Sequence, residues 1–336
     1  MRLKSLNYTN IKNYITAVAQ TGVYSNRIRI EASGACQLKC ADCGHSIGGM
    51  ETIGKGYLKI GDFKRFVDAY PSIRNIELSN YGEMFLNPDL KKIIEYAHMK
   101  NISLVAENGV NFNTASDDMI ESLVRYHFKK MVVSIDGATN EIYKIYRVGG
   151  DLGKVLENIK KINRYKQRYN TAFPHLSWQF VIFGHNEHEI PLARRMAADL
   201  NMHFETKLNW SATYSPVKDK EFVRREAGPI SEQEYERDSG RLYCWACCQL
   251  WNSPQINWDG RLLGCCCNKY SDFGNVFEEG LKECLNSERY IYAKKMVSGR
   301  AKEREDIPCF YCKTYKKMKS KNMYVNPAYC KVLFFL

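Results

Sequence analysis

The sequence predicts an α/β protein, with an open, partial (β/α)6 TIM-like barrel followed by a small cysteine-rich α+β domain made of a β-hairpin and a helix. Two observations support this prediction. In the first part of the chain, short β-rich runs alternate with amphipathic helical segments, which indicates a parallel sheet with right-handed crossovers. Beyond residue 209 the alternation stops, and nine of the 13 cysteines then fall between residues 244 and 312.

The predicted barrel strands are runs rich in β-branched and aromatic residues. They cover Ile28–Ala32, Ile76–Ser79, Ser103–Glu107, Met131–Ile135, Trp178–Phe183 and Phe204–Leu208. Helices are predicted after the start signal Asn87-Pro88-Asp89, over Leu152–Tyr169 and over Glu189–Leu200. These units are fewer than a closed barrel needs, so we expect an open barrel with its chemistry at the C-terminal ends of the strands.

The second domain begins after a polar, irregular stretch, Asn209–Gly228, which we interpret as a linker. Two β-rich runs, Pro254–Trp258 and Arg261–Cys265, flank Asp259-Gly260 and predict a hairpin. A helix over Leu281–Val297 follows. The predicted boundaries are 1–24 for an N-terminal segment, 25–210 for the barrel, 211–320 for the cysteine-rich domain and 321–336 for a tail.

Composition excludes some classes of protein. No run approaches the ~20 apolar residues of a membrane span, and the N-terminus lacks the apolar block of a secretory signal. We therefore expect a soluble, cytoplasmic protein. The net charge of +12 is typical of a solvated basic surface or of a protein with an acidic or phosphorylated partner. An odd number of cysteines without a signal peptide favours metal binding over a disulfide framework.

Three cysteines directly follow the first predicted strand. Cys36, Cys40 and Cys43 have the spacing C-x3-C-x2-C. Three thiolates can bind three irons of a cubane cluster and leave the fourth iron without a protein ligand. An open coordination position is what a catalytic metal site requires. A structural zinc site with His45 as its fourth ligand is the alternative that this spacing leaves open.

These cysteines and the segments at later strand ends resemble the radical SAM superfamily over most of the chain. The motif Asn80-Tyr81-Gly82-Glu83 is similar to the family's Gly-Gly-Glu, with Tyr81 in place of the first glycine. The resemblance implies that Glu83 accepts hydrogen bonds from the methionyl ammonium of S-adenosylmethionine and that Arg147 pairs with its carboxylate. The cofactor-binding residues implied in this way are Asp42, Asn80, Tyr81, Gly82, Glu83, Asn108, Ser134, Asp136, Arg147, Gln179 and Val181.

The C-terminal cysteines resemble the auxiliary-cluster domain called SPASM, in its shortened form called Twitch. The pattern of a cysteine, then Gly260, then Cys265 after four residues fits this family. The resemblance implies an auxiliary 4Fe–4S cluster on Cys248, Cys265, Cys309 and Cys312. Either Cys244 or Cys247 is an alternative to Cys248, and zinc is an alternative metal for four thiolates. No role is assigned to Cys266 and Cys267.

The resemblance implies an enzyme that cleaves S-adenosylmethionine reductively to a 5′-deoxyadenosyl radical and abstracts a substrate hydrogen. We expect an oxidoreductase or epimerase that acts on a small polar substrate, sugar-like or phosphorylated, with electrons from a flavodoxin- or ferredoxin-type donor. Maturation of a ribosomally made peptide by crosslinking, epimerisation or thioether formation is the alternative. An iron–sulfur or zinc module that binds nucleic acid is a more distant one, and we expect neither nucleic acid nor a membrane as a partner.

Overall fold

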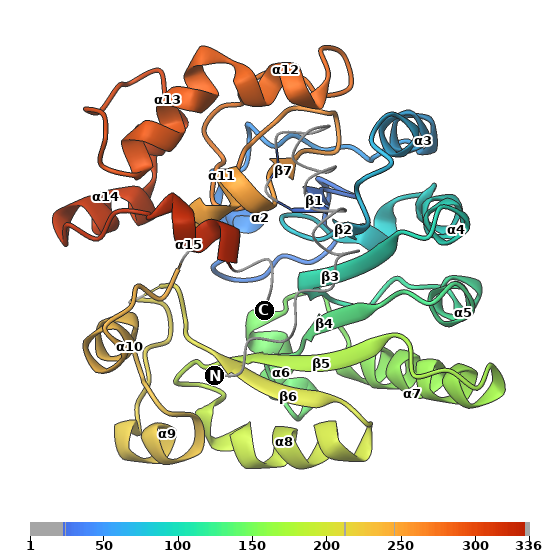
Figure 1. The fold of residues 1–336 in the computed structure, drawn as a ribbon. Helices are drawn as coiled ribbons and strands as arrows, with labels where there is room; N and C mark the ends of the chain where they lie inside the picture. The colour runs from blue at the N-terminus through green and yellow to red at the C-terminus, as the bar shows by residue number, and fades with distance from the viewer. Residues whose placement is uncertain (1–22, 24, 212, 245, 333–336) are drawn as a thin grey trace.

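The computed structural model describes residue 23 and residues 25–211, 213–244 and 246–332. Apart from Val23, the predicted N-terminal segment 1–24 lies outside the described residues, as does the end of the predicted tail, 333–336. A seven-stranded parallel sheet with the strand order β6-β5-β4-β3-β2-β1-β7 forms the centre of the molecule (Figure 1). Its strands are β1 (Arg27–Ile30), β2 (Asn75–Glu77), β3 (Ser103–Val110), β4 (Lys130–Ser134), β5 (His175–Val181), β6 (His203–Lys207) and β7 (Gln255–Ile256).

The sheet confirms the predicted open, partial barrel. Each of the six predicted runs overlaps one of the strands β1 to β6, and neighbouring strands along the chain are neighbours in the sheet. The register is parallel throughout, for example Ser134 beside Gln179 and Gln179 beside Glu205. Because all these strands run the same way, the segments that follow them meet at one edge of the sheet.

Helices cover the outer face of this sheet, as Figure 1 shows for α3, α4, α5, α7 and α8. Helix α4 shows why these helices pack on the sheet. Its apolar residues recur at helical spacing on one face and are all buried: Leu90, Ile93, Ile94 and Ala97. The covering helices span α3 (Ile60–Ala69), α4 (Leu90–Met99), α5 (Asp117–Arg125), α7 (Leu152–Arg168) and α8 (Ile190–Asp199). In the described residues, no helix combines the length and the apolar character needed to cross a bilayer.

The remaining helices are short and lie in the connections and in the C-terminal part of the chain. The α-helices are α2 (Gly44–Ile47), α6 (Asn140–Tyr146), α9 (Lys220–Ala227), α10 (Glu232–Ser239), α11 (Gln249–Asn252), α12 (Leu281–Asn286), α13 (Glu288–Val297), α14 (Lys313–Ser320) and α15 (Pro327–Val332). The 3-10 helices are η1 (Met84–Leu86), η2 (Glu187–Glu189), η3 (Ala246–Cys248) and η4 (Pro308–Tyr311).

Two predictions about the C-terminal part were wrong. The stretch interpreted as a linker contains helix α9, which begins where the Asp219 side chain accepts a hydrogen bond from the Phe222 amide at 2.9 Å. Val223 is the one fully buried residue of α9, and Phe222 and Ala227 are only partly buried against the core, so the apolar face of this eight-residue helix is narrow. The predicted helix Leu281–Val297 is broken at Ser287, whose extended backbone (φ −59°, ψ 147°) ends α12 and whose hydroxyl caps α13.

The predicted hairpin forms a turn, but its first strand also extends the barrel sheet. At Asp259-Gly260 the chain reverses, with Gly260 at φ +91° and an antiparallel bridge between Ile256 and Leu262. The same Ile256 pairs with Ile30 of β1 in parallel register. The cysteine-rich part is therefore joined to the barrel by strand pairing through β7, and not by a linker alone.

Candidate active site

The loop that carries Cys36, Cys40 and Cys43 runs from the end of β1 to helix α2. Backbone hydrogen bonds fix it to the segment after α6: the Lys39 amide donates to the Val148 carbonyl at 2.9 Å, and the Ala41 amide donates to the Tyr146 carbonyl at 3.1 Å. Cys40 is buried, whereas Cys36 and Cys43 are half-buried. The loop thus presents three thiols at the edge of the sheet where the strands end.

The donor set fits a cubane cluster. Burial is the largest cause that raises the pKa of the Cys36 thiol, to about 12, so a thiolate here depends on a bound metal. Among residues 23, 25–211, 213–244 and 246–332, no three Cys, His, Asp or Glu side chains converge closely enough for a single metal ion. A cubane does not require such convergence, because its irons are separate and each thiolate binds a different one.

Gly82 and Glu83 follow β2 and lie beside this loop. A Cβ on Gly82 would overlap the Ser33 carbonyl oxygen, so only glycine allows this close approach of two backbones. The Glu83 carboxylate is 2% exposed and accepts hydrogen bonds from the Asn111 amide at 2.7 Å and the Phe85 amide at 3.2 Å. Burial outweighs these bonds and raises the pKa of Glu83 to about 7. Its hydrogen-bond donors are uncharged amides and each oxygen can accept a further bond, so this carboxylate is suited to bind a cationic group.

Arg147 and Asp136 form a buried ion pair at the same edge. Asp136 is fully buried and accepts hydrogen bonds from Arg147 Nε at 2.6 Å and from the Val181 amide at 2.8 Å. Arg147 Nη1 lies 3.7 Å from Cys40 Sγ. Since both Asp136 oxygens have partners in the protein, Asp136 orients Arg147, and Arg147 faces the cysteine loop.

Polar side chains continue this row along the sheet edge. The Asn108 amide group donates to Asn80 Oδ1, and Asn80 in turn donates to the carbonyl of Cys266 at 3.3 Å. Ser134 Oγ lies against Gly109, where φ is +114° and a Cβ would overlap the hydroxyl. The structure therefore brings Asn80, Asn108 and Ser134 to the edge that carries Gly82, Glu83 and Arg147. Asp42 lies near Tyr214. Burial is the largest cause that raises the pKa of Tyr214, and the charge of Asp42 is the next one.

A cavity of about 450 Å³ opens between the ends of β5 and β6 and the C-terminal cysteines. Its lining includes Gln179, Glu205, Lys207, Trp210, Cys244 and Cys266. Lys207 Nζ donates to Gln179 Oε1 at 3.5 Å, and burial lowers the pKa of Lys207. Sequence reasoning did not single out Lys207 or Trp210, although the position of Lys207 at the end of a predicted strand was a usable signal.

The C-terminal thiols of Cys247, Cys265, Cys309 and Cys312 lie together. After burial, the charges of Cys309 and Cys312 are the next causes that raise the pKa of Cys247. After burial, the charges of Cys247, Cys266, Cys312 and Cys309, in that order, raise the pKa of Cys265. Four buried or half-buried thiols from three separate segments thus form one group, the four-cysteine group. Since no three of them converge on a single metal ion, the group fits the separate irons of a cubane cluster.

Cys248, the predicted ligand, is contradicted by the structure. Cys248 forms a disulfide with Cys330 of α15, the one disulfide in the described part of the chain. Neighbouring residues of a tight helical turn such as η3 point in different directions, so Cys247 and Cys248 cannot face the same site. The disulfide therefore favours Cys247, which the sequence had left as an alternative to Cys248, as the predicted ligand.

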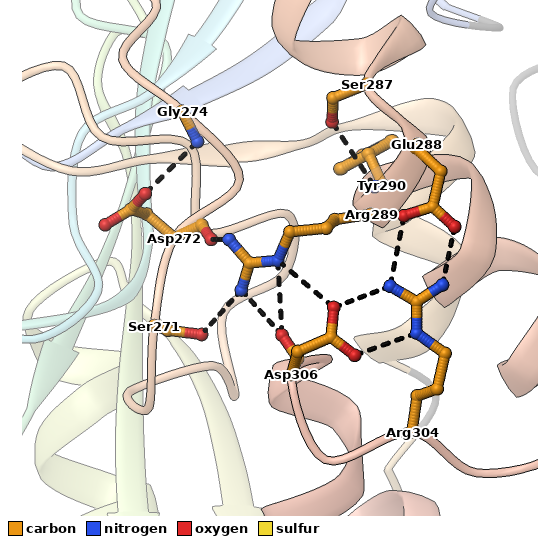
Figure 2. A network of polar contacts seen from close by, with 9 residues as sticks. All are labelled: Ser271, Asp272, Gly274, Ser287, Glu288, Arg289, Tyr290, Arg304 and Asp306. Carbon is orange, nitrogen blue, oxygen red and sulfur yellow. Dashed lines mark hydrogen bonds and ion pairs between the residues drawn. The ribbon is translucent and has the colours of Figure 1, made fainter.

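Figure 2 shows a network of ion pairs and hydrogen bonds that joins two segments of this four-cysteine group. Arg289 on α13 donates to the Asp306 carbonyl at 2.6 Å, close before Cys309, and to the Asp272 carbonyl at 3.1 Å, soon after Cys265. Arg304 pairs with Glu288 and, at 2.6 Å, with Asp306. The network ties the loop of Cys309 and Cys312 to the turn that follows Cys265.

Comparisons with known proteins agree with this geometry. A family model described as the radical SAM superfamily matches residues 30–196. A second one, SPASM, described as an iron–sulfur cluster-binding domain, matches residues 247–314 and so begins at Cys247. No curated protein sequence matches the chain.

Solved structures with a similar fold include Streptococcus suis SuiB bound to S-adenosylmethionine. The TM-score is 0.60 at 13% identity, with 92% of this chain and 75% of that chain covered. Native anSMEcpe with bound AdoMet and the Cp18Cys peptide has a TM-score of 0.57 at 15% identity, with 86% of each chain covered. At these identities the likeness is one of fold.

Proposed function

This chain belongs to the radical SAM superfamily and carries a SPASM iron–sulfur domain, and on that premise we propose that it oxidises or epimerises a small polar substrate held in the cavity beside Lys207. The family implies a 4Fe–4S cluster with S-adenosylmethionine and auxiliary iron–sulfur binding in the SPASM domain. When bound, these groups supply a 5′-deoxyadenosyl radical that abstracts a substrate hydrogen, and an electron acceptor beside the substrate.

The observation that carries the proposal is the arrangement around the cysteine loop. Arg147, oriented by Asp136, and the buried carboxylate of Glu83 lie on the strand-end side of Cys36, Cys40 and Cys43. A guanidinium and a carboxylate are the complements of the carboxylate and ammonium of an amino-acid group. We assign Arg147 and Glu83 to that group of S-adenosylmethionine.

The cavity supports a small polar substrate. Its volume of about 450 Å³ lies in the usual range for small-molecule sites. Lys207 is the basic group of its lining, and Lys207 Nζ reaches Gln179 at the end of β5. We assign Lys207 to an anionic substrate group such as a phosphate, which holds the reacting C–H bond near the cofactor.

Detection of 5′-deoxyadenosine tests the reaction. The anaerobically reconstituted protein, given dithionite and S-adenosylmethionine, is expected to form 5′-deoxyadenosine and methionine. Addition of deuterated candidate substrates, sugar phosphates first, is expected to transfer deuterium into 5′-deoxyadenosine. A reconstituted protein that forms no 5′-deoxyadenosine would contradict the proposal.

Peptide maturation is the second candidate, and one feature of the cavity favours it. Trp210 lines both the 450 Å³ cavity and a neighbouring cavity of about 340 Å³, which also contacts Val217 and Ile230. Together the two cavities offer a longer binding region than a small substrate would occupy, and such a region suits an extended peptide. SuiB has been solved with its precursor peptide SuiA, and anSMEcpe with a peptide. Val217→Trp, which fills the second cavity, is expected to stop turnover of a peptide and to spare that of a small substrate.

A further inference from the structure

Tyr81 links the two cysteine-containing parts of the molecule. Its hydroxyl oxygen lies 2.8 Å from the carbonyl oxygen of Cys266 and 2.8 Å from that of Asn268, so one O–H is shared between two acceptors. Asn80 adds a weaker contact to the Cys266 carbonyl at 3.3 Å. These bonds cross about half the length of the chain, and they join the end of β2 to the turn that begins at Cys265.

The strand-end side of this contact is firmly held. The Tyr81 amide donates to the buried carboxylate of Glu31 at 2.9 Å, and the Glu83 amide donates to the Ala35 carbonyl at 2.8 Å, next to Cys36. The Tyr81 side chain therefore extends from a backbone whose position is set by the cysteine loop itself.

The turn on the other side is ordered by its own contacts. The Cys266 amide donates to Gln249 Oε1 at 2.7 Å, and the Asn268 side chain donates to the carbonyls of Leu263 and Ser271, each at 2.7 Å. Both carbonyls that face Tyr81 belong to this turn, and Cys266 also lines the cavity. A shift of the turn would move Cys265, an assigned auxiliary ligand, and the wall of the cavity together.

We propose that Tyr81 is a positioning residue whose hydroxyl fixes the Cys265–Asn268 turn against the strand end that carries Gly82 and Glu83. It sets the distance between the cofactor side of the cavity and the auxiliary-cluster side. The assignment of those two sides rests on the proposed function. The glycine that the family motif has at this position offers no hydroxyl, so the link is a property of this chain.

The test compares the holoenzyme with its Tyr81→Phe variant, which keeps the ring and removes only the hydroxyl. Loss of a shared hydrogen bond is expected to speed hydrogen exchange of the Cys266, Asn268 and Tyr270 amides about tenfold. The EPR signal of the reduced auxiliary cluster is expected to change, whereas the iron content stays at the wild-type value. Tyr270→Phe is the control, because Tyr270 lies beside the same turn and its ring contacts Tyr311.

Wild-type exchange and a wild-type auxiliary EPR signal in Tyr81→Phe would overturn the inference. Equal changes in Tyr270→Phe would overturn it too, since they would show a general sensitivity of the turn. The exchange measurement does not depend on turnover. A wild-type protein that failed to cleave S-adenosylmethionine would therefore refute the proposed function and leave the exchange result to decide on Tyr81.

Discussion

The cysteine loop and the four-cysteine group are built in opposite ways. Cys36, Cys40 and Cys43 lie in one loop between β1 and α2, and only Cys40 is buried. Cys247, Cys265, Cys309 and Cys312 come from three segments far apart in the chain. A local spacing is sufficient to bring the first set together, whereas the second set depends on the packing of η3, the hairpin and η4.

The two regions also differ in what surrounds the thiols. The loop faces the ion pair of Arg147 with Asp136 and the carboxylate of Glu83, which are groups suited to a polar ligand. The four-cysteine group is surrounded by protein, with Tyr290 on α13 fully buried beside it. The difference indicates that the cysteine loop is arranged to bind a cofactor, whereas the four-cysteine group is arranged to hold a metal in place.

The largest effect is expected from loss of one loop cysteine. Cys40→Ala removes one of the three ligands of the loop. Formation of 5′-deoxyadenosine should therefore fall to background, and the iron content should fall by about four atoms per chain. Iron and sulfide analysis with chromatography of the products measures both. The auxiliary EPR signal should persist, and its disappearance would contradict the independence of the two sites.

The next effect separates two adjacent cysteines. Cys247→Ala is expected to lose the auxiliary iron, about four atoms per chain, because Cys247 lies with Cys265, Cys309 and Cys312. Cys248→Ala is the matched control and should keep that iron, since Cys248 pairs with Cys330. If Cys248→Ala were the variant that lost the iron, the reassignment would be wrong.

A smaller effect concerns pH and the loop site alone. Burial raises the pKa of Glu83 to about 7. Below that pH the carboxyl group is protonated and cannot attract the methionyl ammonium. As the pH increases toward 7, the affinity for S-adenosylmethionine should therefore rise by up to tenfold per pH unit, and it should level off near pH 7. Equilibrium dialysis between about pH 5.5 and about pH 7.5 measures this rise.

Glu83→Gln gives the control for that pH dependence. The amide has no charge to lose, so binding should be weaker by about tenfold above pH 7 and flat across the range. A slope that survives in Glu83→Gln would assign the titration to another group. The iron content of the four-cysteine group should be the same at every pH and in both proteins.

The smallest effect is expected at the network of Figure 2. Arg289→Gln removes the charged donor that joins Asp272 to Asp306, which should lower the free energy of unfolding by about 1–2 kcal/mol and speed loss of auxiliary iron to a chelator. Arg300→Gln, at an exposed position, is the control. Equal iron release from both variants would show that the network does not support the group.

Much of the barrel was predictable because its signals are local. The apolar period of α4 and the six β-rich runs arise from neighbouring residues, and the overlap with β1 to β6 follows from that. The break at Ser287 was missed because no glycine or proline marks it, although the buried residues of α12 and those of α13 do not share one helical face. Helix α9 was missed because it has only eight residues and its apolar face, formed by Phe222, Val223 and Ala227, is narrow.

The sequence by itself determined the spacing of the three-thiol loop, the order of the first six strands and the two cysteine-rich regions. Spacing and periodicity act over a few residues, so they can be read without coordinates. Only the tertiary structure decided that Cys247 rather than Cys248 faces the other thiols, that β7 extends the barrel sheet, and that Tyr81 reaches Cys266. These choices depend on the directions of side chains from segments distant in the chain, which no local pattern encodes.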